Sequence, residues 1–134
     1  MIQRENEIKP LTVTSPSSEE KLYDLSILQE MDDQEYIIEI ISMFLKDAPK
    51  EFKEIKEALA AGNTDVVYKK AHKLKSSAGI LQANNLIVLL TEIELVAKSG
   101  EKGAKLISLF DNAQQQYKNL ENALQKLIKD MRAG

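Results

Sequence analysis

Apolar side chains recur every three or four residues through most of this 134-residue chain. An α-helix has 3.6 residues per turn, so this spacing lines the apolar residues along one helical face. No segment alternates apolar and polar residues as a half-buried strand does. Turn-forming residues are also scarce, with five Gly and three Pro. The pattern therefore predicts an all-α fold.

The apolar pattern divides into one short and four long segments. A short helix is predicted at residues 26–31, anchored by Leu25 and Leu28. The four long apolar faces consist of Ile37, Ile41, Phe44, Ala48, Phe52, Ile55 and Leu59; Val67, Ala71, Leu74, Ala78 and Leu81; Leu86, Leu89 or Leu90, Ile93 and Val96 or Ala97; and Leu106, Phe110, Ala113, Tyr117, Leu120, Leu124, Leu127 and Met131. Because short connections join these segments, we expect an antiparallel four-helix bundle with a short extra N-terminal helix.

Local signals predict where the helices begin and end. Asp32 stands three residues before Glu35, which is the spacing of a capping box with Asp in place of the usual hydroxyl residue. Pro49 lies inside the first long segment, and we expect it to kink that helix or split it in two, because proline lacks an N–H. The residues predicted to cap helix N-termini are Asp32, Asn63 or Thr64, and Asn84.

Length and composition restrict the class of protein. The chain has the length of one domain, with residues 1–18 expected to form a flexible tail or linker and residues 19–134 the helical domain. With no Cys and one His, thiolate and multi-histidine metal sites are excluded. The net charge, 18 − 21 = −3, argues against general nucleic-acid binding. Neither a membrane-spanning run nor a secretory signal is visible, so we expect a cytoplasmic protein.

The single histidine is predicted to face solvent. The apolar residues from Val67 to Leu81 fall within about 80° of helical arc, and His72 lies about 135° from the centre of that arc. Ser76 and Gly79 are small, and they leave a shallow surface of the kind that close approach by another macromolecule requires. The residues expected to share this outward face are Tyr68, Lys69, Lys75, Ser76 and Gly79.

The charge near His72 suggests a chemical role. Lys75 stands at the i+3 position, from which its ammonium reaches atoms bonded to the imidazole. A nearby cation opposes protonation of the ring and can offset the charge of a bound phosphoryl group. The pair therefore predicts a phosphoryl-accepting site. Two alternatives stay open: an incidental surface histidine, and a merely solvated helix face for the run Lys69, Lys70, Lys73 and Lys75.

The segment around the histidine reads Ala71-His72-Lys73-Leu74-Lys75-Ser76-Ser77-Ala78-Gly79-Ile80-Leu81-Gln82-Ala83. This run closely resembles the signature of histidine-containing phosphotransfer (HPt) domains, which is built around Ala-His-x-Leu-Lys-Gly and has a Leu further on, here Leu86. Glu94 follows Ile93 where the family has Leu-Glu. Ser76 and Gln82 stand where the family has Gly. The resemblance covers residues 23 to 100 or so.

The resemblance implies a four-helix bundle with a phosphorylated histidine on an exposed face. His72 would accept a phosphoryl group on the ring nitrogen farther from the backbone, and Lys75 would lie beside the phosphate. Glu94 would lie near the other ring nitrogen and hold the tautomer. Ser76 could crowd a docking partner or donate a hydrogen bond to the phosphate. The residues expected to support the site or its docking are Tyr68, Lys69, Lys73, Ser76, Gly79 and Glu94.

An HPt domain is a phosphocarrier rather than an enzyme, and this sequence has no Gly-rich nucleotide loop. The resemblance implies no cofactor of its own, with Mg²⁺ supplied by a response-regulator receiver domain. Expected partners are receiver domains and a hybrid sensor histidine kinase, and the chain is expected to be a monomer. Three alternatives stay open: a receiver-binding module that is never phosphorylated, the phosphoacceptor part of a histidine kinase, and a helical adaptor. Lys73 disfavours the second, because kinases usually place an acidic residue directly after the histidine.

Overall fold

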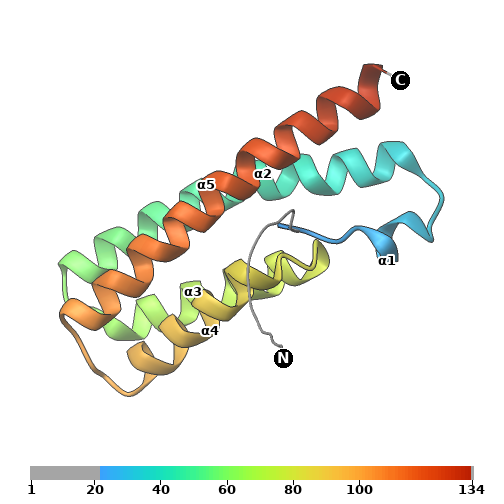
Figure 1. Ribbon diagram of the computed structural model, residues 1–134. Helices are drawn as coiled ribbons and strands as arrows, with labels where there is room; N and C mark the ends of the chain where they lie inside the picture. The colour runs from blue at the N-terminus through green and yellow to red at the C-terminus, as the bar shows by residue number, and fades with distance from the viewer. Residues whose placement is uncertain (1–21, 134) are drawn as a thin grey trace, which may run out of the picture.

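The computed structural model describes residues 22–133, in which five helices and no strand occur. The helices are α1 (Ser26–Gln29), α2 (Gln34–Ala60), α3 (Thr64–Ile80), α4 (Asn84–Lys98) and α5 (Ala104–Ala133). The four long helices form a bundle in which α2 and α5 project beyond the shorter α3 and α4 (Figure 1). The expected all-α bundle is confirmed. The expected tail at residues 1–18 lies outside the described residues.

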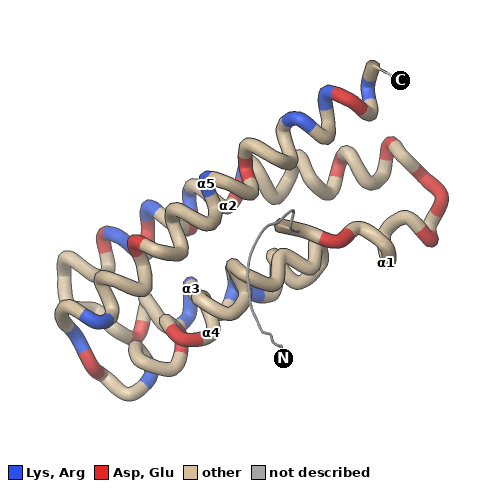
Figure 2. Tube along the Cα trace, in the orientation of Figure 1, with Lys and Arg blue, Asp and Glu red and all other residues tan. Residues whose placement is uncertain are grey.

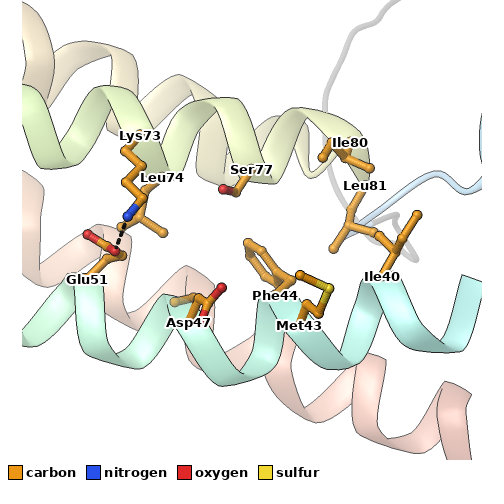
Figure 3. Close-up of a pocket in the computed structure, with 11 residues that line it drawn as sticks. Ile40, Met43, Phe44, Asp47, Glu51, Lys73, Leu74, Ser77, Ile80 and Leu81 are labelled. Carbon is orange, nitrogen blue, oxygen red and sulfur yellow. Dashed lines mark hydrogen bonds and ion pairs between the residues drawn. The ribbon is translucent and has the colours of Figure 1, made fainter.

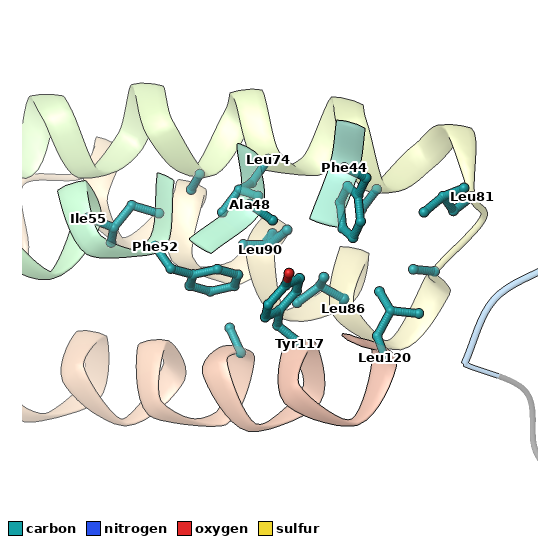
Figure 4. Close-up of a cluster of buried hydrophobic side chains, with 14 of the residues drawn as sticks. Phe44, Ala48, Phe52, Ile55, Leu74, Leu81, Leu86, Leu90, Tyr117 and Leu120 are labelled. Carbon is teal, nitrogen blue, oxygen red and sulfur yellow. The ribbon is translucent and has the colours of Figure 1, made fainter. Parts of the chain in front are cut away.

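The core follows the predicted apolar faces closely. Of the two pairs left open, Leu90 and Ala97 are the buried members. Three other residues predicted on the apolar faces are only half-buried: Leu59, Leu127 and Met131. Aromatic rings occupy the middle of the bundle (Figure 4), where the Tyr117 ring centroid lies 5.2 Å from that of Phe52 and 5.9 Å from that of Phe44. These ring contacts pack α2 against α5. The buried residues of α3 and α4, in contrast, are all aliphatic.

Two of the predicted caps are wrong. Asp33, not Asp32, caps α2, because its Oδ1 accepts from the Tyr36 N–H at 3.0 Å. Asp32 instead adopts the left-handed conformation, with φ 52°, in the turn before the helix. Asn84 is the first helical residue of α4 rather than its cap, since a tight turn places Ala83 at the cap position without a side-chain hydrogen bond. The prediction at Asn63 is confirmed: its Oδ1 accepts from the Val66 N–H at 3.2 Å.

Helix α2 runs through Pro49 as one element. Of the two outcomes expected at Pro49, a kink or a split, the split is excluded. Ala48 and Phe52, on either side of the proline, are both buried in the same core. Tertiary packing of the apolar face on both sides thus outweighs the loss of one backbone hydrogen bond.

The first described residues are tied to the far end of α3. The Asp24 N–H donates to the Leu81 carbonyl at 2.9 Å, and Leu25 and Leu28 are buried as predicted. Helix α1 ends at Gln29, two residues earlier than predicted, because the backbone turns at Glu30 and Met31. Within residues 22–133, no helix combines the length and apolar character that crossing a bilayer requires.

Candidate functional site

His72 projects from the outward face of α3. Its neighbours Ala71 and Leu74 are fully buried and fix that helix on the core. The imidazole lies on the other side, with 58% of its side-chain surface exposed. The exposure predicted from helical spacing is therefore observed, and a buried structural histidine is excluded.

The imidazole is held by a carboxylate from the next helix. Glu94 of α4 has only 13% of its side chain exposed, and its Oε2 lies 2.9 Å from His72 Nδ1. A carboxylate accepts hydrogen bonds, so Nδ1 carries the proton in this contact, and the lone pair of the neutral form of the ring lies on Nε2. The arrangement fixes both the tautomer and the orientation of the ring.

Lys75 reaches the same carboxylate. Its Nζ lies 2.6 Å from Glu94 Oε1, and its side chain is 29% exposed. Burial opposes ionisation of Glu94, but the contacts with Lys75 and His72 outweigh it, so the pKa of the Glu94 carboxyl lies below its ordinary value. Glu94, His72 and Lys75 form what we call the Glu94 cluster. Its lysine is already ion-paired in the resting molecule.

The lysines around His72 do not form an unpaired positive patch. Each of the four has an acidic partner: Lys69 with Asp65 at 3.1 Å, Lys70 with Glu54 at 2.7 Å and Glu51 at 3.4 Å, Lys73 with Glu51 at 2.8 Å, and Lys75 with Glu94 at 2.6 Å. Along the helices, basic and acidic positions are interspersed (Figure 2). The run of cations in the sequence is therefore largely neutralised by carboxylates of the fold.

A second carboxylate is buried on the other side of α3. Glu51 of α2 has 7% of its side chain exposed and binds Lys70 and Lys73. Burial opposes ionisation of Glu51, yet the two lysines outweigh it and lower the pKa of its carboxyl. Glu51, Lys70 and Lys73 form what we call the Glu51 cluster. Sequence reasoning missed it, because nothing in the pattern marks Glu51 as buried.

The small residues near His72 leave a shallow surface beside the imidazole. The Ser76 hydroxyl donates to the His72 carbonyl at 3.2 Å, so it is turned back onto its own helix. A Cβ added at Gly79 would meet no atom within 4 Å. Nothing inside the described chain therefore demands glycine at this exposed position. Tyr68 is half-buried, and the Lys98 ammonium lies 5.4 Å from the centre of its ring.

An apolar groove of about 190 Å³ runs between α2 and α3, beside the His72 face. Figure 3 shows Met43 and Ile40 from α2 facing Ile80 from α3, with the Glu51–Lys73 ion pair at one end. Met43 is 59% exposed and Ile80 is 52% exposed. Sequence reasoning missed the groove, although apolar residues just off the core face of each helix were a usable signal.

Metal-binding clusters were a second kind of site to consider in the part of the chain that the structure describes. Among residues 22–133, no three acidic or histidine side chains gather closely enough to hold a metal ion. The Glu94 cluster itself offers a lone pair on Nε2 of the neutral imidazole, a carboxylate that accepts from Nδ1–H, and the positive charge of the Lys75 ammonium.

Comparison with known proteins identifies a family and a shared fold. The family model described as Hpt domain matches residues 39–134, a span that includes the whole Glu94 cluster. Among solved structures, the chain is similar to histidine-containing phosphotransfer protein B (HptB) from Pseudomonas aeruginosa PAO1, with a TM-score of 0.76 and 21% identity. That match covers 81% of this chain and 96% of the other, and it shows a shared fold. No curated protein matches the chain.

Proposed function

Because this chain belongs to the Hpt domain family, we propose that it is a phosphorelay intermediate in which His72 accepts a phosphoryl group from a receiver-domain aspartate and passes it to another. Hpt domains are phosphocarrier modules of two-component signalling rather than classical enzymes. The observation that carries the proposal is the exposed imidazole whose Nδ1 is engaged by Glu94. This contact leaves the Nε2 lone pair for a nucleophilic attack.

The proposed step balances without proton transfer. The Nε2 lone pair attacks the phosphorus of the aspartyl phosphate, the N–P bond forms, and the bond from phosphorus to the aspartate oxygen breaks. The electron pair of that bond returns to the receiver's carboxylate. Nδ1 keeps its proton throughout, and the positive charge that develops on the ring faces Glu94. Transfer to the second receiver is the reverse of this step.

The other site residues support the transfer in the same proposal. Lys75 supplies positive charge near the phosphoryl group, and the 2.6 Å contact with Glu94 supports this role because it brings the ammonium close to the ring. Ser76 is a further hydrogen-bond donor once its hydroxyl rotates away from the His72 carbonyl. Tyr68, Lys69 and Lys73 lie around the face that a partner would cover.

We place the receiver on the α2–α3 groove and the flat surface at Gly79. Exposed Met43 and Ile80 offer apolar surface to bury, while the absence of a side chain at Gly79 permits close approach to His72. In this proposal the receiver brings the Mg²⁺, a hybrid sensor histidine kinase stands upstream, and the chain acts as a cytoplasmic monomer. Sedimentation of the purified chain tests the monomer.

The decisive experiment mixes the purified chain with receiver domains phosphorylated by acetyl phosphate. Label is expected to move onto the chain and to be acid-labile and base-stable, as a phosphohistidine is. His72→Gln is expected to abolish acceptance while leaving the helical signal unchanged, because the imidazole is mostly exposed. Acceptance by the His72→Gln variant would refute the proposal. Binding of receivers without any transfer to the wild type would instead indicate a binding module.

A further inference from the structure

One carboxylate of Glu94 serves two partners at once. Oε2 accepts from His72 Nδ1, and Oε1 lies 2.6 Å from Lys75 Nζ. Oε1 is buried, and the Lys75 ammonium is its ion-pair partner among the residues described. If Lys75 moved away, a buried carboxylate oxygen would lose that partner, which is energetically unfavourable.

A phosphoryl group on His72 would lie within reach of the same lysine. Lys75 stands three residues after His72, so the two side chains are neighbours on the helix surface. The phosphoryl oxygens carry negative charge and are strong hydrogen-bond acceptors. Lys75 is the cation of the Glu94 cluster, whereas Lys73 is held by Glu51 on the α2 side. The phosphoryl group and Glu94 Oε1 are therefore both within reach of the same ammonium.

Resting on the function proposed above, we propose that Glu94 competes with the phosphoryl group for the Lys75 ammonium and thereby limits how far Lys75 stabilises phosphorylated His72. Forming the contact between Lys75 and the phosphoryl group breaks the contact between Lys75 and Glu94. Only the difference in free energy between these two contacts of Lys75 then favours the phosphorylated state. Such compensation keeps the two states close in free energy, as a carrier that must also release its phosphoryl group requires.

Competition predicts that two substitutions are coupled. In the wild type, Lys75→Ala removes one contact from each state, so the equilibrium constant for loading is expected to fall by less than about threefold. Glu94→Gln keeps an acceptor for Nδ1–H but removes the ion pair of the resting state. In that background Lys75→Ala is expected to lower the equilibrium constant by about tenfold, because a charge-assisted hydrogen bond is then lost from the phosphorylated state alone.

The test uses phosphoramidate as the phosphoryl donor and needs no receiver. Nε2 forms its bond to phosphorus as the donor's P–N bond breaks and its nitrogen leaves as ammonia. Wild type, Lys75→Ala, Glu94→Gln and the double variant are each equilibrated at a fixed ratio of phosphoramidate to ammonium. The ³¹P NMR signals give the ratio of phosphorylated to free protein. Thermal melts verify the fold, and Glu94→Ala provides a second background for the same comparison.

Lys70→Ala is the matched control. Lys70 lies on the same helix and has its own partners, Glu54 at 2.7 Å and Glu51 at 3.4 Å. Its substitution is expected to have the same small effect in both backgrounds. Equal effects of Lys75→Ala in the two backgrounds overturn the proposal, as does a wild type that phosphoramidate does not load. A wild type that is loaded but accepts nothing from any receiver overturns the proposed function instead, and leaves the competition for Lys75 standing.

Discussion

Helix α3 lies between two largely buried carboxylates, Glu51 on α2 and Glu94 on α4. Each binds two nitrogen-bearing side chains of α3, and each meets one of them 22 residues away in sequence. The difference is the type of partner. Glu51 binds two lysines, whereas Glu94 binds one lysine and the imidazole of His72.

Under the proposed function, that difference separates a structural cluster from a reactive one. A lysine ammonium at neutral pH has no lone pair, so the Glu51 cluster joins two helices but offers no nucleophile. An imidazole held at Nδ1 keeps a lone pair on Nε2, so the Glu94 cluster can perform a nucleophilic reaction. Two carboxylates with similar burial and similar charged partners thus differ in their proposed roles, because only the Glu94 cluster includes an exposed imidazole.

The largest expected effects come from removing each of the two buried carboxylates in turn, and they test whether the two clusters differ. Glu51→Ala is expected to lower the free energy of unfolding by about 1–3 kcal/mol, because it leaves the lysines without their shared buried partner. It is expected to leave loading by phosphoramidate nearly unchanged. Glu94→Ala is expected to slow loading on the order of tenfold, since the imidazole loses its orienting partner. Urea denaturation and loading rates measure both.

The opposite results would refute the distinction between the Glu51 cluster and the Glu94 cluster. If Glu51→Ala slowed loading as strongly as Glu94→Ala does, both carboxylates would act on His72. If Glu94→Ala lowered stability far more than Glu51→Ala, the Glu94 cluster would be mainly structural. Circular dichroism of both variants at low temperature provides the control for a retained helical fold.

A smaller effect concerns acid stability. Burial disfavours the charged form of both carboxyls, but their lysine partners outweigh it and hold the pKa of each below the ordinary value. Their contribution to stability is therefore complete above the ordinary pKa of glutamate and is lost as pH falls through the folded value. Glu51→Gln and Glu94→Gln are each expected to reduce the loss of stability on acidification. Denaturation midpoints measured from pH 7 to pH 3 check this, and an unchanged slope in both would contradict it.

The smallest expected effect is that of removing Lys73, and it tests whether Lys73 and Lys75 have different roles. The Lys73 side chain is 63% exposed, and Glu51 keeps Lys70 when Lys73 is removed. Lys73→Ala is therefore expected to cost less than about 1 kcal/mol of stability and to leave the loading equilibrium unchanged in both the wild type and the Glu94→Gln background. A dependence on Glu94 like that expected for Lys75 would show that both lysines serve the phosphoryl group.

Several features of the site were predictable because they depend on one helix alone. The exposure of His72 follows from its angle to Ala71, Leu74 and Ala78, which are all buried. The position of Lys75 beside it follows from the i+3 spacing. The cap at Asn63 was predictable for the same reason. Asp32 and Asp33, in contrast, are neighbouring residues of the same type, and only the backbone conformation decides which of them caps α2.

The sequence by itself determined the helices, their apolar faces and the side of α3 on which His72 lies, because these depend on contacts within a few residues. Only the tertiary structure decided which carboxylate meets which lysine, and that the groove between α2 and α3 lies open. Those contacts join residues about twenty positions apart. They depend on how each helix is rotated against its neighbours, and the packing of the whole core sets that rotation.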